Sequence, residues 1–123
     1  MDTKPLIEEI KNSAREIYKE LGAGYNEEIY EEAIAIELRQ RKISYEVERN
    51  TEIFYKGSKV GIHRLDFILE GKLVVELKAQ MGLTKSHIGQ TKAYLKTLKL
   101  TDAILINFPY PDKDEPDFME INL

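Results

Sequence analysis

Residues 63–78, HRLDFILEGKLVVELK, are typical of two β-strands joined by a tight turn at Gly71. Apolar and polar residues alternate on both sides of this glycine, which is the pattern of a hairpin. Asp66 and Glu76 each lie five residues from Gly71, so a turn centred there sets the two carboxylates opposite one another. Because side chains alternate between the faces of a strand, Lys78 shares the face of Glu76. The stretch therefore predicts three charged groups converging on one face of a sheet.

Two facing carboxylates repel, and partial burial raises the cost because ionised groups lose hydration. A hard divalent cation would compensate, since Mg²⁺ and Mn²⁺ prefer carboxylate oxygens and water and need few protein ligands. Lys78 would then lie where an ammonium group can orient a water or stabilise a phosphate. The alternative is structural: Asp66 pairs with Arg64 or Lys78, while Glu76 and Lys78 are solvated outward positions of an antiparallel sheet.

An Asp on one strand, followed ten residues later by Glu-x-Lys on the next, resembles the core motif of the PD-(D/E)xK nuclease superfamily. Residues 24–30, GYNEEIY, resemble the pattern of the GxxExxY proteins, a bacterial and archaeal family placed in that superfamily. The likeness continues in order through residues 30–32, 38–39, 55–57, 64–66, 75–79 and 105–108. One departure is Leu65, which stands where the superfamily's name has a proline.

This resemblance implies an α/β (α+β) fold with a restriction-endonuclease-like core, in which helices flank a mixed central sheet. It also implies a Mg²⁺- or Mn²⁺-dependent nuclease that hydrolyses phosphodiester bonds in nucleic acid, with DNA as the expected substrate. Asp66 and Glu76 would hold the metal together with the backbone carbonyl of Leu77. Lys78 would position the attacking water, and Gln90 would support it.

Two helices are expected before the hairpin. Apolar residues at steps of three and four predict a helix over residues 4–21, which the glycines at 22 and 24 end. Asn26 is a suitable N-cap for a second helix that runs to about Arg41, with apolar positions that predict packing on two sides. Glu27 and Glu31 share one face of it. They complement the helix dipole, and the resemblance implies that Glu27 is a further metal ligand and catalytic acid.

Alternating residues over 45–48, 51–56 and 59–62 predict a meander with turns at residues 49–50 and 57–58. This meander leads into the organising hairpin. His63, close to Asp66 in sequence, is a candidate ligand or base. A histidine at a loop edge without a second histidine nearby more often has a structural role, which is the favoured interpretation.

A basic helix is expected after the hairpin. Residues 77–100 contain five lysines and no acid, and within a predicted helix over 85–99 four of the lysines fall within roughly 60° of one another. This basic stripe consists of Lys85, Lys92, Lys96 and Lys99. It is either a solvated helix face or a track for the phosphates of nucleic acid.

Gln90 and Tyr94, four residues apart on this helix, resemble a Gln-x-x-x-Tyr element that follows the catalytic strand in some nuclease branches. Tyr94 is expected either to stack on a base or ribose or to belong to the core. Further on, residues 102–108, DAILINF, predict a buried central strand reached by a crossover, and residues 118–123 predict a closing edge strand.

Composition limits the function. The 123 residues, 42% of them hydrophobic, predict a single domain over 1–123. No apolar run approaches the ~18 residues of a membrane span, no cysteine is present, and a cytoplasmic location is expected. The net charge of −4 does not favour broad contact with nucleic acid. Two alternatives to a nuclease therefore stay open: an interaction module within a complex or homodimer, and a scaffold in which a metal only neutralises the hairpin.

Overall fold

The computed structural model describes residues 2–123, except for the side chains of residues 48, 49 and 63–65. Five strands form one mixed sheet in the order β1-β2-β3-β4-β5. β3 and β4 are parallel, and the other neighbours are antiparallel. The elements in chain order are α1 (Lys4–Leu21), α2 (Glu27–Gln40), β1 (Tyr45–Tyr55), β2 (Ser58–Leu69), β3 (Leu73–Lys78), α3 (Lys85–Leu98), β4 (Asp102–Asn107) and β5 (Asp117–Asn122). The prediction of a mixed sheet flanked by helices is confirmed.

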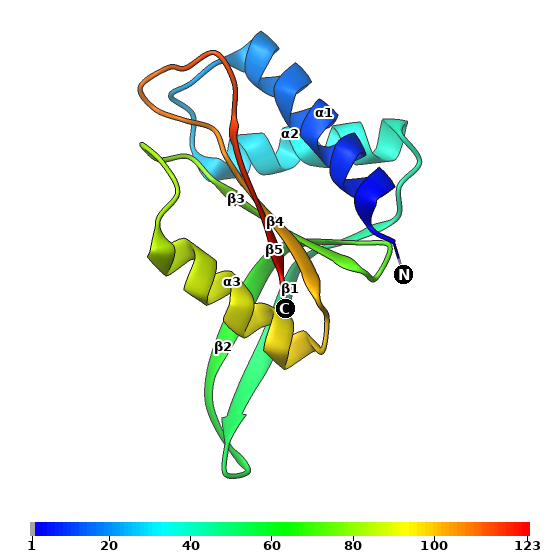
Figure 1. Ribbon diagram of the computed structural model, residues 1–123, viewed down its shortest axis with the longest axis vertical. Coiled ribbons are helices and arrows are strands. Elements are labelled where there is room, and N and C mark those ends of the chain that lie inside the picture. The colour runs from blue at the N-terminus through cyan, green and yellow to red at the C-terminus, as the bar shows by residue number, and fades with distance from the viewer. Residues whose placement is uncertain (1) are drawn as a thin grey trace.

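Helices cover both faces of the central strands (Figure 1). On one face, Leu73, Val75 and Leu77 of β3 pack in a cluster with buried residues of α1 and α2. On the other face, Val74 packs in a cluster with Leu95 of α3. Burial on both faces explains the continuous apolar run of β4, which needs a hydrophobic side chain at nearly every position.

The organising hairpin has the predicted register. Phe67 lies opposite Val75 and Leu69 lies opposite Leu73, so Gly71 is at the centre of the turn. Glu70 and Gly71 both have positive φ, at 52° and 66°. Glycine adopts this conformation without steric cost. The glycine therefore fixes the pairing that brings Asp66 and Glu76 together.

The predicted meander is wrong. β1 and β2 are two long strands rather than four short ones, because Asn50 lies opposite Arg64 and continues the antiparallel ladder without a turn. The second predicted turn, at residues 57–58, is present one residue earlier, at Lys56 and Gly57, which have φ of 49° and 81°. The cross-strand pairing on both sides of Asn50 outweighs the turn preference of a single Asn, and the register of the ladder shifts only later, between Ile53 and Phe54.

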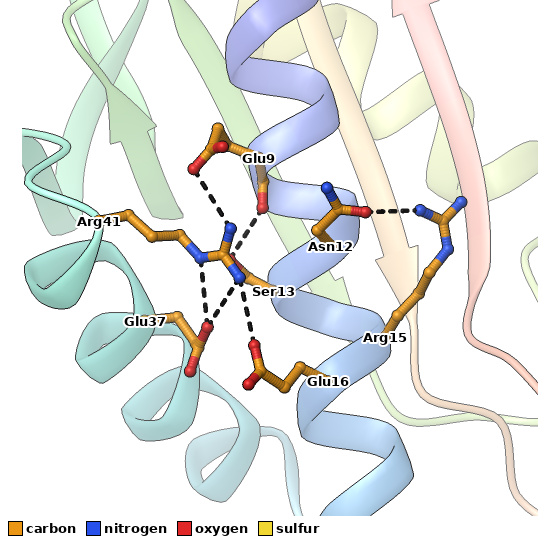
Figure 2. A network of polar contacts seen from close by, with 7 residues as sticks. All are labelled: Glu9, Asn12, Ser13, Arg15, Glu16, Glu37 and Arg41. Carbon is orange, nitrogen blue, oxygen red and sulfur yellow. Dashed lines mark hydrogen bonds and ion pairs between the residues drawn. The ribbon is translucent and has the colours of Figure 1, made fainter.

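A charge network joins the first two helices (Figure 2). The Arg41 guanidinium, directly after α2, lies 3.2 Å from carboxylate oxygens of Glu9 and Glu16 on α1 and of Glu37 on α2. Its side chain is only 22% exposed, so solvent screens these pairs less than ordinary surface pairs. Arg41 thereby holds α2 against α1.

Only one side of α2 is packed, which corrects the prediction of packing on two sides. Tyr30, Ile34 and Leu38 are fully buried against the sheet and α1, whereas Ile29 and Ile36 are 42% and 47% exposed. No second layer covers these two side chains in the described part of the chain. An apolar groove between α1 and α2 results, with a volume of about 320 Å³.

The helix that follows the hairpin has well-defined ends. Thr84 and His87 form a capping box, in which the Thr84 hydroxyl accepts from the His87 N–H and His87 Nδ1 accepts from the Thr84 N–H. Lys99, with φ of 59°, ends α3. Within the described residues, no helix combines the length and apolarity needed to cross a membrane.

Candidate active site

Asp66 and Glu76 take the place of backbone groups where β2 and β3 part. The backbone pairing of these strands covers residues 67–69 and 73–75. At the next position the Leu77 N–H donates to Oδ2 of Asp66 at 2.7 Å, and the Asp66 N–H donates to Oε1 of Glu76 at 3.1 Å. Each carboxylate thus accepts a hydrogen bond from the opposite strand, and the geometry places the two acids side by side.

Glu76 is an unusual carboxyl group because it is only 4% exposed. Burial, followed by the charge of Asp66, raises the pKa of Glu76 to about 8. The backbone hydrogen bond and the Lys78 ammonium oppose this shift without cancelling it. The alternative interpretation of the sequence, in which Glu76 is a solvent-exposed residue on the outer face of the sheet, is therefore wrong.

Lys78 and Glu27 lie within electrostatic reach of this pair. Burial raises the pKa of Glu27, Lys78 lowers it and Asp66 raises it. Lys78 is half-buried at the end of β3, where its carbonyl accepts from the Phe108 N–H at 2.9 Å. Three acids and one lysine, from α2, β2 and β3, therefore gather at one place, as the sequence predicts.

The GxxExxY-like segment has a physical reason for each of its three named positions. Gly24 has a φ of 102°, a conformation that side chains strongly disfavour. Glu27, at the start of α2, faces the acidic pair. Tyr30 is fully buried, stacks on Phe108 with ring centroids 4.1 Å apart, and donates to the Gly22 carbonyl at 2.6 Å. The tyrosine therefore fixes the helix end from which Glu27 projects.

Two residues of α3 face the site from the other layer. Burial raises the pKa of Tyr94 to about 12, with further contributions from Glu76 and Asp66. Burial and the charge of Lys78 lower the pKa of His87. Tyr94 is only 6% exposed and packs in the α3 cluster, which favours its core role over base stacking. His87 was not predicted as a site residue, although a spacing of seven residues places it on the same helix face as Tyr94.

The remaining predicted residues of α3 lie on the surface. Gln90 is exposed, and no described contact joins it to Asp66, Glu76 or Lys78. The four lysines of the basic stripe are also exposed: Lys85, Lys92, Lys96 and Lys99. The side chain of His63 lies outside the described residues, so its role as ligand or base stays a prediction.

Asn107, which lies in the family-like segment 105–108 but had no predicted role, is a second residue that positions the site. It is fully buried at the end of β4. Its amide oxygen accepts from the Gln80 N–H, and its amide nitrogen donates to the Gln80 carbonyl, both at 2.9 Å. The same nitrogen donates to Asp117 of β5 at 3.1 Å. Asn107 therefore anchors the chain just after Lys78. Two sequence signals pointed to it: it is a polar residue in an apolar run, and it lies in the segment 105–108 that resembles the family.

A cavity of about 220 Å³ lies beside Asp66 on the α2 side of the sheet. Glu31 and Arg39 of α2, Tyr45 of β1 and Phe67 of β2 contribute to its wall. Arg39 donates to the Tyr45 hydroxyl at 2.9 Å. Asp66, which is half-buried, therefore lies at the edge of a space with partly polar walls.

The donor set suits a hard divalent cation. Asp66 and Glu76 each use one oxygen in a backbone hydrogen bond, and the burial of Glu76 makes neutralisation of its charge favourable. In the described part of the chain, no three His, Cys, Asp or Glu side chains are arranged as a ready ligand group. The protein therefore presents two carboxylates, which is the sparse set that Mg²⁺ accepts when water completes its shell.

Comparison with known proteins agrees with this geometry. Residues 4–118 match the model of the PD-(D/E)XK nuclease superfamily. The chain therefore belongs to this superfamily, whose members generally use divalent metals. Its five-stranded sheet and flanking helices conform to the restriction-endonuclease-like fold.

Among solved structures, the crystal structure of SSO0001 has a similar fold, with a TM-score of 0.58 and 24% sequence identity. The alignment covers 77% of this chain and 48% of that one, so this chain spans about half the length of SSO0001. Among curated proteins, no significant match is found.

Proposed function

We propose that the protein is a cytoplasmic Mg²⁺- or Mn²⁺-dependent nuclease of the GxxExxY type that hydrolyses phosphodiester bonds, with DNA as its substrate. The observation that carries the proposal is the pairing of Asp66 with the buried Glu76. A fold needs no such pair for stability, because burying adjacent carboxylates is costly. A cation that both groups bind removes this cost and explains their arrangement.

The residues present fit such a cation. Asp66, Glu76 and the Leu77 carbonyl would hold it, and Glu27 would add an oxygen directly or through water. The ion would supply a Lewis acid that lowers the pKa of a bound water and offsets the charge on the phosphate.

The other residues act on water and substrate. The Lys78 ammonium orients the attacking water and stabilises negative charge on the phosphate oxygens. Gln90 supports substrate or water from the exposed face of α3, which requires that this helix approach the phosphate. The exposed basic stripe supports a phosphate track, because it concentrates positive charge on an otherwise acidic protein.

Calorimetric titration with Mn²⁺ tests the metal site. We expect the wild type to bind and Glu76→Gln to bind at least tenfold more weakly, because a neutral amide is a poor ligand. Glu120→Gln, an exposed acid on β5, is the matched control and is expected to bind as the wild type does. A cleavage screen with Mn²⁺ over single-stranded, duplex and branched DNA follows. A folded wild type that binds Mn²⁺ and cleaves none of these would contradict the nuclease assignment.

The exposed groove between α1 and α2 favours a second candidate, an interaction module that serves a protein partner or a homodimer. Leu21, Ile29 and Ile36 are 38%, 42% and 47% exposed along it. Exposed apolar patches of this kind often mark interfaces. Sedimentation with and without chelator distinguishes the candidates, since association through this groove is expected to be independent of metal.

A further inference from the structure

The β1–β2 ribbon extends beyond the rest of the sheet. β3 pairs with β2 only at residues 67–69, whereas the pairing of β1 with β2 continues to Tyr55 opposite Ser58. The outer part of the ribbon therefore projects away from α1 and α2 with no described strand beside it (Figure 1). The described side chains of this outer part belong to neither core cluster, so they are available to contact another molecule.

The outer ribbon carries a concentration of exposed apolar side chains. Phe54 and Tyr55 are 59% and 63% exposed, and Val60 and Ile62 on the opposite strand are 63% and 51% exposed. Single exposed apolar residues are common on protein surfaces. Here four lie within nine residues, and the two aromatic rings are on opposite faces of the ribbon because Phe54 and Tyr55 are neighbours on one strand. Such a concentration of exposed apolar side chains on a projecting element is characteristic of a contact element.

The tip is also basic and narrow. Residues 53–60 include two lysines and no acid. The Lys56 ammonium lies 5.4 Å from the centre of the Tyr55 ring, and Lys59 is 4.0 Å from Glu52. The two-residue turn at Lys56 and Gly57 keeps the end of the ribbon no wider than two strands. Aromatic rings beside cations at a narrow tip are suited to bases and phosphates together.

The ribbon is continuous with the candidate active site, because β2 contains Asp66 and runs from there to the ribbon tip. From Asp66 to Ser58 the chain spans eight residues, or about 26 Å at the rise of an extended strand. This distance corresponds to roughly eight base-pair steps of duplex. A nucleic acid with its scissile phosphate at Asp66 therefore reaches the tip within one helical turn.

We propose that the ribbon tip is a wedge that binds nucleic acid at a discontinuity, such as a fork where duplex opens into single strands. Phe54 and Tyr55 stack on bases that have lost a neighbour, while Lys56 and Lys59 contact the flanking phosphates. A continuous duplex offers no free base face and must be unstacked at a cost before the rings can insert. This inference rests on the proposed nuclease function and specifies its substrate class.

Fluorescence anisotropy with a labelled DNA fork and a fully paired duplex of equal length tests the wedge. In Ca²⁺, used to suppress cleavage, we expect the wild type to bind the fork about tenfold more tightly than the duplex. Phe54→Ala combined with Tyr55→Ala removes both rings. It is expected to weaken fork binding about tenfold and to change duplex binding by less than twofold.

Two controls separate stacking from damage to the fold. Phe54→Tyr combined with Tyr55→Phe keeps both rings and is expected to keep the preference for the fork. Leu123→Ala, which removes an apolar side chain that is 52% exposed directly after β5, is expected to leave both affinities unchanged. Loss of fork preference in either control overturns the wedge.

The remaining outcomes separate this inference from the proposed function. Equal affinity for fork and duplex in a wild type that cleaves DNA overturns the wedge and leaves the nuclease. No binding of either DNA overturns both. A wild-type dimer that becomes monomeric when the two rings are removed shows that the ribbon is a self-association surface, which also overturns the wedge.

Discussion

Oδ2 of Asp66 accepts a hydrogen bond from the strand of Glu76, and Oε1 of Glu76 accepts one from the backbone of Asp66. The two side chains thereby continue the β2–β3 ladder at the point where its backbone pairing stops. The same carboxylates are the expected ligands of the metal. The pairing of the strands and the proposed metal chemistry consequently depend on the same two carboxylates.

The raised pKa of Glu76 predicts a pH-dependent stability. The folded protein retains a proton that the unfolded chain releases near 4.5, and burial is the main cause because it holds the folded pKa at about 8. More protons are bound in the folded state between these values, so the free energy of unfolding falls as pH rises from about 4.5 to about 8. Urea denaturation without metal measures the free energy of unfolding at each pH. In this range the wild type should lose about 1 kcal/mol more per pH unit than Glu76→Gln does. Identical dependence on pH in the two proteins would contradict the raised pKa of Glu76.

Metal affinity is expected to follow the same titration in the opposite direction. A protonated Glu76 must release its proton before it can bind a cation, so Mn²⁺ binding should weaken by up to tenfold for each pH unit below about 8. Calorimetry in two buffers of different ionisation enthalpy measures the released proton directly. Binding at pH 7 without proton release would be inconsistent with the high pKa.

Lys78→Ala is expected to reduce Mn²⁺-dependent cleavage by about 10²- to 10⁴-fold, which is the usual effect of removing a group that assists proton transfer. Folding should be retained because Lys78 is half-buried and contributes its carbonyl, not its side chain, to the contact with Phe108. Circular dichroism checks the fold, and Lys72→Ala, on the turn before β3, is the matched control. Wild-type cleavage by Lys78→Ala would exclude the proposed mechanism.

The basic stripe should determine how binding depends on salt. Lys92→Gln combined with Lys96→Gln removes two phosphate contacts. It should reduce the slope of log affinity against log salt by about two for duplex DNA. The paired control, Lys4→Gln with Lys19→Gln, changes the same net charge on α1 and should leave the slope unchanged. Equal slopes in the two double variants would assign the stripe to the solvated surface.

Arg41→Ala is expected to lower the free energy of unfolding by about 1–2 kcal/mol, because it removes the cation that three carboxylates share and leaves their like charges to repel one another. Arg41→Lys should recover only part of this loss, since an ammonium group lacks the planar fork of the guanidinium. The difference in the free energy of unfolding between the wild type and Arg41→Ala should be smaller in 1 M salt. A loss that is unaffected by salt would point to packing by the arginine stem instead.

The sequence predicted what local periodicity controls. Patterns of apolar residues and turns predicted four features: the bounds of α1, the register centred on Gly71, the crossover to β4, and the proximity of Asp66, Glu76 and Lys78. These features require only information carried within each segment. They were therefore available without the structure.

Features that depend on the partner segment were missed or wrong. The turn expected at residues 49–50 disappears because β2 supplies a continuous partner, which no property of β1 alone reveals. His87 approaches Lys78 only because of the way α3 crosses the sheet. Likewise, the burial of Tyr94 depends on the layer above β3. Tertiary placement therefore determines each of these cases.

The reciprocal hydrogen bonds affect how inactive variants of this protein should be chosen. Removing the Asp66 carboxylate deprives the Leu77 N–H of its acceptor. The inactivity of an Asp66→Ala protein could therefore come either from the missing carboxylate of the site or from local unfolding of the β2–β3 hairpin. Asp66→Asn keeps an oxygen for that N–H. Lys78, whose side chain has no place in the ladder, is the cleaner position for a catalytically dead reagent that still binds its targets.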